Sequence, residues 1–329
     1  MGVDDEVIES GAAIPYPDLA LGTRHRFLLP AGAMSDGTTV ALPVLVVIGH
    51  VQWPRLVCVA GIHGNEPEGI TALLELWDEI DPGELQGTLV LVPVANPPAF
   101  RAGERRNPHD GLDMNRIFPG SATGTITERL AHRLYEDVTA GADFALTLHG
   151  WSRGGMVTPY VEYPRAGEVS PASRAAAMAF GLDWIEAFDW PPGMLAAVCA
   201  RNGIPAIEPE IGGLECTMPE RRSLYKRGVR NLMRHLGLLA GTPEIEKAAH
   251  EVTRAEVTAP TGGVIRRLRE IGDPVEEGDP IATIGDLLGR PLADVRAPMA
   301  GCIAAQRLAA AVSPGEQLAV IFCAEDEES

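Results

Sequence analysis

The stretch Leu56-Val-Cys-Val-Ala-Gly-Ile-His63-Gly-Asn-Glu66-Pro-Glu-Gly69 is an apolar run that passes into a polar turn and then a helical pattern. Side chains three positions apart lie on one side of a turn or of a first helical turn. An imidazole nitrogen and a carboxylate oxygen are both common zinc ligands. The spacing of His63 and Glu66 therefore predicts two ligands of a metal site at a strand-to-helix junction.

Similar apolar runs recur along the chain and alternate with helical patterns. Strands are predicted at residues 39–48, 56–60, 88–94, 144–148 and 204–211, and helices begin near Glu66, Thr125, Ser170, Gly193 and Thr217. Near-continuous Val, Leu and Ile are typical of strands buried on both faces, as in a mainly parallel sheet. We therefore predict an α/β fold over residues 25–245, with a mixed, largely parallel central sheet flanked by helices.

A catalytic zinc usually has three protein ligands, so a third is required. His149 follows the apolar run 144–148, and the ends of neighbouring parallel strands share one edge of a sheet. His149 is therefore the predicted third ligand. Other interpretations remain open: His63 as a helix cap, His149 as a buried structural histidine, and Glu68 in place of Glu66.

Two further clusters lie downstream of the first pair. Residues 105–120 form a polar loop with three arginines, Arg105, Arg106 and Arg116, in a chain of net charge −18. Guanidinium groups bind carboxylates and stabilise a developing oxyanion, although a salt-bridged surface loop is an equal alternative. Glu210 lies in an apolar strand, where a carboxylate is costly unless it is paired or functional. We interpret it as a general base, with Glu208 as the competing candidate.

The sequence changes character near its C-terminus. Ala259-Pro-Thr-Gly-Gly263-Val-Ile265 recurs as Ala297-Pro-Met-Ala-Gly301-Cys-Ile303, which predicts a small all-β domain over residues 251–324 built from two half-units. The half-units look similar to biotinyl and lipoyl carrier modules, but no lysine follows residue 250, which excludes a swinging-arm carrier. Residues 1–24 are interpreted as an N-terminal arm.

Composition narrows the classes of function. The 329 residues are 46% hydrophobic, as in a globular protein, and the negative charge argues against nucleic acid or an anionic membrane as partner. The start lacks the basic and apolar segments of a secretory signal. Five cysteines occur without a CxxC motif, so we expect a reduced, cytoplasmic setting.

His63-x-x-Glu66, the Asp113-Met-Asn115-Arg116 element, the strand end at His149 and Glu210-Ile-Gly-Gly occur in a specific order. In this order they resemble the succinylglutamate desuccinylase/aspartoacylase family, relatives of the carboxypeptidase A-type zinc peptidases, over about residues 45–240. The resemblance implies a zinc carboxypeptidase-like fold, one Zn²⁺ per chain, a small N-acyl amino acid as substrate, and a homo-oligomer. It therefore implies an amidohydrolase that removes an acyl group from a small amide.

The resemblance also implies roles for individual residues. It assigns zinc binding to His63, Glu66 and His149, the general base to Glu210, carbonyl polarisation to Arg106 with Arg105 as a rival, and binding of the substrate carboxylate to Asn115 and Arg116. One position departs from the family pattern, because Thr147 stands where members commonly have Asp two residues before the second histidine. Two alternatives are a metallocarboxypeptidase acting on short peptides and a non-catalytic ligand-binding relative.

Overall fold

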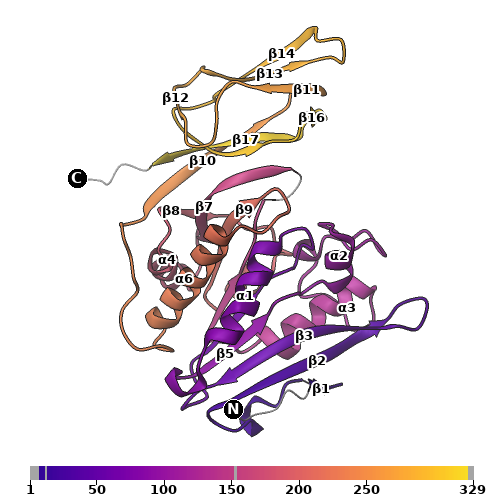
Figure 1. The fold of residues 1–329 in the computed structure, drawn as a ribbon, viewed down its shortest axis with the longest axis vertical. Helices are drawn as coiled ribbons and strands as arrows, with labels where there is room; N and C mark the ends of the chain where they lie inside the picture. The colour runs from indigo at the N-terminus through magenta and orange to yellow at the C-terminus, as the bar shows by residue number, and fades with distance from the viewer. Residues whose placement is uncertain (1–6, 12, 152–153, 325–329) are drawn as a thin grey trace.

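The computed structural model describes residues 7–11, 13–151 and 154–324, and its framework is a mixed sheet of 13 strands (Figure 1). From edge to edge the order is β1-β2-β3-β5-β4-β6-β9-β7-β8-β10-β17-β15-β12. The bounds are β1 Val7–Glu9, β2 Thr23–Ala33, β3 Thr39–Ile48, β4 Arg55–Val59, β5 Thr88–Val92, β6 Phe144–Thr147, β7 Gly155–Pro164, β8 Trp184–Phe188, β9 Ala206–Gly213, β10 His250–Thr258, β12 Pro274–Val275, β15 Gly301–Arg307 and β17 Gln317–Ala324.

The centre of the sheet confirms the sequence prediction. Strands β5, β4, β6 and β9 run parallel to one another, and every residue of β4, β5 and β6 is buried. Parallel strands of this kind are covered on both faces, which their continuous Val, Leu and Ile content indicated. Antiparallel pairs join β3 to β5 and β7 to β9, so the whole sheet is mixed.

Helices cover both faces of the sheet. Against one face pack α1 (Pro67–Glu79), α4 (Ser170–Phe180) and α6 (Pro219–His235), and against the other pack α3 (Ile126–His132), the π-helix η4 (Arg133–Thr139) and α5 (Leu195–Arg201). Short helices α2 (Pro97–Ala102), η1 (Tyr16–Asp18), η2 (Pro82–Glu84) and η3 (Met114–Arg116) complete the set. Alternate strand residues divide between these cores: Leu56 and Cys58 face α1, whereas Val57 and Val59 face α3 and α5. The capping box at Thr125, which the sequence predicted, is present.

Four strands that precede the C-terminal segment were not predicted from the sequence, namely β1, β2, β7 and β8. Strand β2 contains three basic residues and a register shift between Pro30 and Gly32, so its pattern resembles neither a buried strand nor a regular amphipathic one. Strand β7 includes polar and proline residues, yet most of it is buried because it lies between β9 and both β8 and β15. The tertiary neighbours of these segments, rather than their own patterns, determine their structure.

The two copies of the repeated sequence near the C-terminus both lead into strands. A second sheet has the order β14-β13-β11-β16, with β11 Gly263–Arg267, β13 Pro280–Gly285, β14 Pro291–Arg296 and β16 Ala311–Val312. Gly263 and Gly301 occupy equivalent positions at the starts of β11 and β15. A Cβ at either glycine would lie 2.5 Å or less from a carbonyl oxygen of the adjacent strand, so the repeated glycine permits close strand contact.

Strand β15 also connects this β-rich segment to the rest of the protein. It pairs with β7, and in this register Arg307 lies opposite Gly155 at the start of β7. In Figure 1 the C-terminal strands lie at one end of the molecule and β1–β3 at the other. Within residues 7–11, 13–151 and 154–324, no helix combines the length and apolar character needed to cross a membrane.

A row of buried carboxylates crosses strands β9, β7 and β8 at Glu208, Glu162 and Glu186, which are register neighbours. Arg254 of β10 lies 3.4 Å from both Glu162 and Glu186. Burial raises the pKa of Glu186 to about 8, and Glu162 adds to this effect while Arg254 opposes it. Arg254 therefore does not keep Glu186 fully ionised at neutral pH.

This row predicts a pH-dependent stability. Between the unfolded pKa of about 4.3 and the folded value, the native state holds a proton that the unfolded state releases, so stability falls as pH rises. Glu186→Gln lacks this proton and should not lose stability in the same way. The free energy of unfolding of the variant minus that of wild type should therefore increase by about 1–2 kcal/mol between pH 5 and pH 8. Urea unfolding at both pH values measures this, with the exposed Glu246→Gln as control. An unchanged difference would contradict the prediction.

Candidate active site

The first two predicted ligands lie at the C-terminal end of β4, where the chain turns into α1. Gly61 has a φ of 63°, and a Cβ at Gly64 would lie only 2.1 Å from the Ala99 carbonyl carbon, so the turn requires glycine at both positions. Glu66 is the N-cap residue of α1, and its side chain makes no capping hydrogen bond. This turn directs both His63 and Glu66 inward rather than along the helix.

The third predicted ligand, His149, is fixed by backbone contacts just beyond β6. Its N–H donates to the Pro209 carbonyl at 3.0 Å, and its carbonyl accepts from the Ile211 N–H at 3.0 Å, which ties it to β9. The Tyr225 hydroxyl also donates to the His149 carbonyl. The expected meeting of strand ends at one sheet edge is therefore present.

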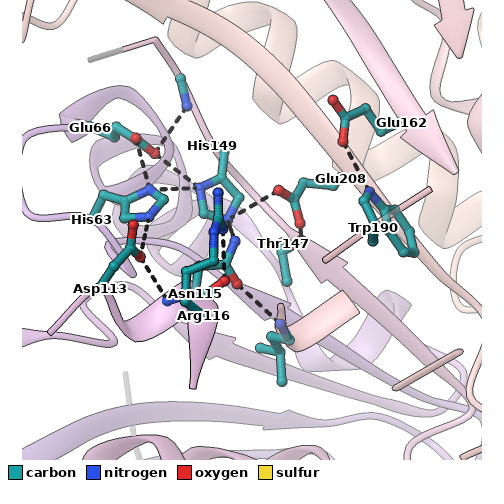
Figure 2. A network of polar contacts seen from close by, with 12 residues as sticks. His63, Glu66, Asp113, Asn115, Arg116, Thr147, His149, Glu162, Trp190 and Glu208 are labelled. Carbon is teal, nitrogen blue, oxygen red and sulfur yellow. Dashed lines mark hydrogen bonds and ion pairs between the residues drawn. The ribbon is translucent and has the colours of Figure 1, made fainter. Parts of the chain in front are cut away.

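His63, Glu66 and His149 converge, as Figure 2 shows, with side chains no more than 5% exposed. The two Glu66 oxygens lie 2.8 Å from His63 Nδ1 and 3.0 Å from His149 Nδ1, and the two Nδ1 atoms are 3.2 Å apart. Burial opposes ionisation, but the two imidazoles hold the pKa of Glu66 well below its usual range. The two histidines thus offset the energetic cost of burying the ionised Glu66 carboxylate.

The donor set fits a zinc ion. One potential ligand atom from each of the three residues lies within 4.8 Å of the others, and two imidazole nitrogens with one carboxylate oxygen are a common catalytic zinc set. His63 Nε2 lies 3.1 Å from Asp113 Oδ1, and such outer carboxylates fix the orientation of a ligating imidazole. The alternatives of a helix-capping His63 and a purely structural His149 do not account for this convergence.

Glu68, the open alternative to Glu66, points elsewhere. It is 2% exposed, and its Oε1 lies 3.0 Å from Arg221 Nη1 on α6. Burial raises the pKa of Glu68, while the hydrogen bond from Arg221 lowers it. Glu68 therefore joins α1 to α6 and is not part of the His63 cluster.

Glu210 and Glu208, which the sequence could not separate, differ clearly in their surroundings. Glu210 lines a cavity of ≈ 390 Å³, and its buried Oε2 has no hydrogen-bond partner among the residues that the structure describes. Glu208 is buried away from that cavity and accepts a hydrogen bond from Thr147 at 2.8 Å. Burial raises the pKa of Glu210 well above its usual value, and the nearby carboxylate of Glu66 contributes while His149 opposes. A carboxylate with these properties is suited to proton transfer.

The two adjacent arginines of the loop also separate. Arg105 lies over the cluster, with Nε 3.0 Å from Asp113 Oδ2 and Nη1 3.3 Å from Glu66 Oε1. Arg106 lines the cavity and makes no hydrogen bond or ion pair with any residue in the described part of the chain. Arg105 is therefore engaged by carboxylates, whereas the Arg106 guanidinium is available to a ligand.

The predicted substrate-binding pair, Asn115 and Arg116, lies in the short helix η3. Arg116 lines the cavity, and its Nη1 donates to the Asn115 carbonyl at 2.8 Å. The Asn115 side chain is buried: Oδ1 accepts from the Leu195 N–H at 3.0 Å, and Nδ2 lies 3.4 Å from His149 Nε2 (Figure 2). Only Arg116 of the pair is therefore seen at the cavity wall.

The cavity also has walls that sequence reasoning missed. Trp151 follows His149, while Arg307, Glu316 and Gln317 come from the C-terminal strands and the turn between them. Arg307 Nη2 lies 3.4 Å from Glu316 Oε2. No local motif marks these residues, because only the pairing of β15 with β7 brings them to the site.

Known proteins are similar to this chain over almost its whole length. A protein from Halomonas elongata, N-alpha-acetyl-L-2,4-diaminobutyric acid deacetylase, is 31% identical over 319 residues, covering 91% of each chain. The product-bound structure of the ectoine utilization protein EutE (DoeB) from Ruegeria pomeroyi superposes with a TM-score of 0.86 at 26% identity, covering 93% of this chain and 97% of that one.

A succinylglutamate desuccinylase/aspartoacylase from Rhodobacter sphaeroides superposes with a TM-score of 0.87 at 25% identity, covering 94% of this chain and 98% of that chain. The family model of the succinylglutamate desuccinylase/aspartoacylase catalytic domain matches residues 52–236, a span that contains all of the predicted site residues. The chain therefore belongs to the succinylglutamate desuccinylase/aspartoacylase family, whose matched relatives carry the names of deacylases.

Proposed function

We propose that this protein is a zinc-dependent amidohydrolase that removes the acyl group from a small N-acyl amino acid. One observation carries the proposal: His63, Glu66 and His149 converge beside a cavity lined by Glu210. These three side chains would hold one Zn²⁺. When bound, the ion supplies Lewis acidity and lowers the pKa of water, so that a nucleophile is available near neutral pH.

Glu210 acts as the general base in this proposal. Its carboxylate accepts a proton from the attacking water and returns it to the nitrogen of the leaving amine. The position of this carboxylate on the cavity wall supports the role, because no described residue occupies its buried Oε2. Arg106 stabilises the developing oxyanion, since its guanidinium faces the cavity and Arg105 is occupied by Glu66 and Asp113.

Arg116 binds the substrate carboxylate and aligns the amide bond. The family resemblance gives the same role to Asn115, although its side chain is buried and is not among the residues that line the cavity. Residues 251–324, taken as a separate domain, narrow the cavity through Arg307 and Glu316. A narrowed cavity favours small N-acyl compounds over long peptides.

The substrate class is tested by comparing amides directly. N-α-acetyl-L-2,4-diaminobutyrate is the first candidate, because the Halomonas elongata relative is named for this compound and matches 91% of this chain. We expect hydrolysis of N-acetyl or N-succinyl amino acids and little cleavage of dipeptides. Preferential cleavage of dipeptides would instead support a metallocarboxypeptidase, and no turnover with zinc bound would support a binding protein.

Replacement of Arg116 should weaken substrate binding selectively. A hydrogen bond to a charged group contributes about 1.5–3 kcal/mol, so Arg116→Ala should raise KM for an N-acetyl amino acid by about 10–100-fold. Steady-state kinetics on the matched N-acetyl amino acid amide, which lacks the carboxylate, provides the control. The proposal for Arg116 fails if KM increases equally for the acid and its amide.

Three further expectations complete the proposal. A carboxypeptidase-like fold stays an expectation from the family resemblance, and the mixed sheet and the histidine and glutamate positions at strand ends support it. A cytoplasmic location and a homo-oligomer stay predictions from sequence composition and family resemblance. Cell fractionation and sedimentation of the purified protein test these two expectations.

A further inference from the structure

The two histidines of the cluster have corresponding surroundings. Each turns Nδ1 towards Glu66 and Nε2 towards an acid on the opposite side of the ring. For His63 that acid is Asp113, with Nε2 3.1 Å from Oδ1. For His149 it is Glu208, with Nε2 3.6 Å from Oε1 (Figure 2).

Strand register explains the position of Glu208. Strands β6 and β9 are parallel neighbours with Leu146 opposite Ile207, so the next residues, Thr147 and Glu208, are also neighbours. The Thr147 hydroxyl donates to Glu208 Oε2 at 2.8 Å. Thr147 is fully buried and Glu208 is 2% exposed. The hydroxyl therefore fixes one carboxylate oxygen and leaves the other facing His149.

Glu208 has one cationic partner among the residues that the structure describes. Arg254 pairs with Glu162 of β7, Glu186 of β8 and Glu256 of its own strand, and His149 is the group that lies within ion-pair distance of Glu208. A buried carboxylate is costly without such a partner. Besides the Thr147 hydroxyl, the His149 ring is thus the polar group that faces the Glu208 carboxylate.

Asn115 cannot take that hydrogen. Because the Leu195 N–H donates to Asn115 Oδ1, the amide turns its Nδ2 donors towards His149 Nε2, 3.4 Å away. An amide N–H cannot accept a hydrogen, so when the His149 hydrogen is on Nε2, the acid on that side of the ring is Glu208, with its Oε1 3.6 Å away.

We propose that Glu208 is a positioning residue that faces the Nε2 hydrogen of His149 and so presents the Nδ1 lone pair to the metal, with Thr147 holding Glu208 in place. This inference rests on the proposed function, because it concerns a ligand of the proposed zinc site. Outer carboxylates of this kind fix the tautomer and raise the basicity of a ligating imidazole. The two glutamates of Glu208-Pro-Glu210 then have separate tasks, one at the metal ligand and one at the cavity.

Zinc affinity tests the proposal without recourse to catalysis. Metal-free protein is titrated with Zn²⁺ against a competing chromophoric chelator. We expect Glu208→Gln, which keeps the shape and removes the charge, to raise the Zn²⁺ dissociation constant by about 10–100-fold. Thr147→Val should raise it by less. Glu162→Gln, at the register neighbour of Glu208 on β7, is the matched control and should bind Zn²⁺ as wild type does.

A second pair of variants distinguishes loss of the positioning carboxylate from general damage to the fold, because it moves the carboxylate from β9 to β6. Glu208→Thr should weaken Zn²⁺ binding, and adding Thr147→Asp should restore most of the loss, because the carboxylate then approaches the same ring from β6. Thermal unfolding confirms that each variant is folded. Wild-type affinity in both Glu208→Gln and Glu208→Thr would overturn the assignment. A wild-type protein that takes up no Zn²⁺ would overturn the proposed function itself.

Discussion

Glu210→Gln should reduce kcat by about 10²–10⁴-fold while the protein still binds one zinc per chain, because loss of a general base typically has an effect of this size. Glutamine keeps the volume of the side chain but cannot accept and return a proton. The wild-type carboxylate lines the cavity, and no residue in the described part of the chain makes a hydrogen bond to its buried Oε2.

The control for this prediction lies two residues away. Glu208→Gln, assayed at a Zn²⁺ concentration that saturates that variant, should lose far less turnover than Glu210→Gln, since Glu208 faces Thr147 and His149 rather than the cavity. Zinc content is measured by atomic absorption beside each rate. Full activity in Glu210→Gln, or equal loss in both variants, would show that the base is misassigned.

His63→Ala should abolish both zinc binding and turnover. The side chain is 2% exposed and contributes one of three converging donors, so its loss should exceed the roughly 10–100-fold effect of an outer-sphere partner on affinity. Atomic absorption after dialysis and the rate of N-acetyl amino acid hydrolysis are the two measurements.

His50→Ala is the matched control for His63→Ala. His50 also follows an apolar strand, β3, but that strand ends beside the starts of β5 and β4, at the sheet edge opposite the cluster, and its Nε2 contacts the Gly83 carbonyl at 2.8 Å. This variant should keep its zinc and its activity. Stoichiometric zinc in His63→Ala would remove His63 from the ligand set.

The sequence predicted those strands and site residues that a single local pattern can identify. Apolar runs located β3, β4, β5, β6 and β9, and the strand-end histidine indicated that His149 joins the first pair of ligands. Strands β2, β7 and β8 were missed because their burial depends on neighbours that are distant in the chain. A local pattern reports one strand, whereas burial of polar strands is a property of the complete sheet.

The residues of the candidate site likewise include some that a local motif predicts and some that depend on contacts between strands. Sequence motifs identified Glu210 but left Glu208 as a rival, because two carboxylates on one strand face differ only in what lies opposite them. The positions of Thr147 and Arg307 also depend on contacts across strands. The register of β6 against β9, which no local motif specifies, reveals the contact between Glu208 and His149.

Metal removal and restoration test the central claim most directly. The purified protein should contain one zinc per chain, lose its amidohydrolase activity when a chelator removes the metal, and recover that activity when Zn²⁺ is returned in equimolar amount. A metal-free protein that hydrolyses N-acyl amino acids at the full rate would contradict a mechanism built on His63, Glu66 and His149.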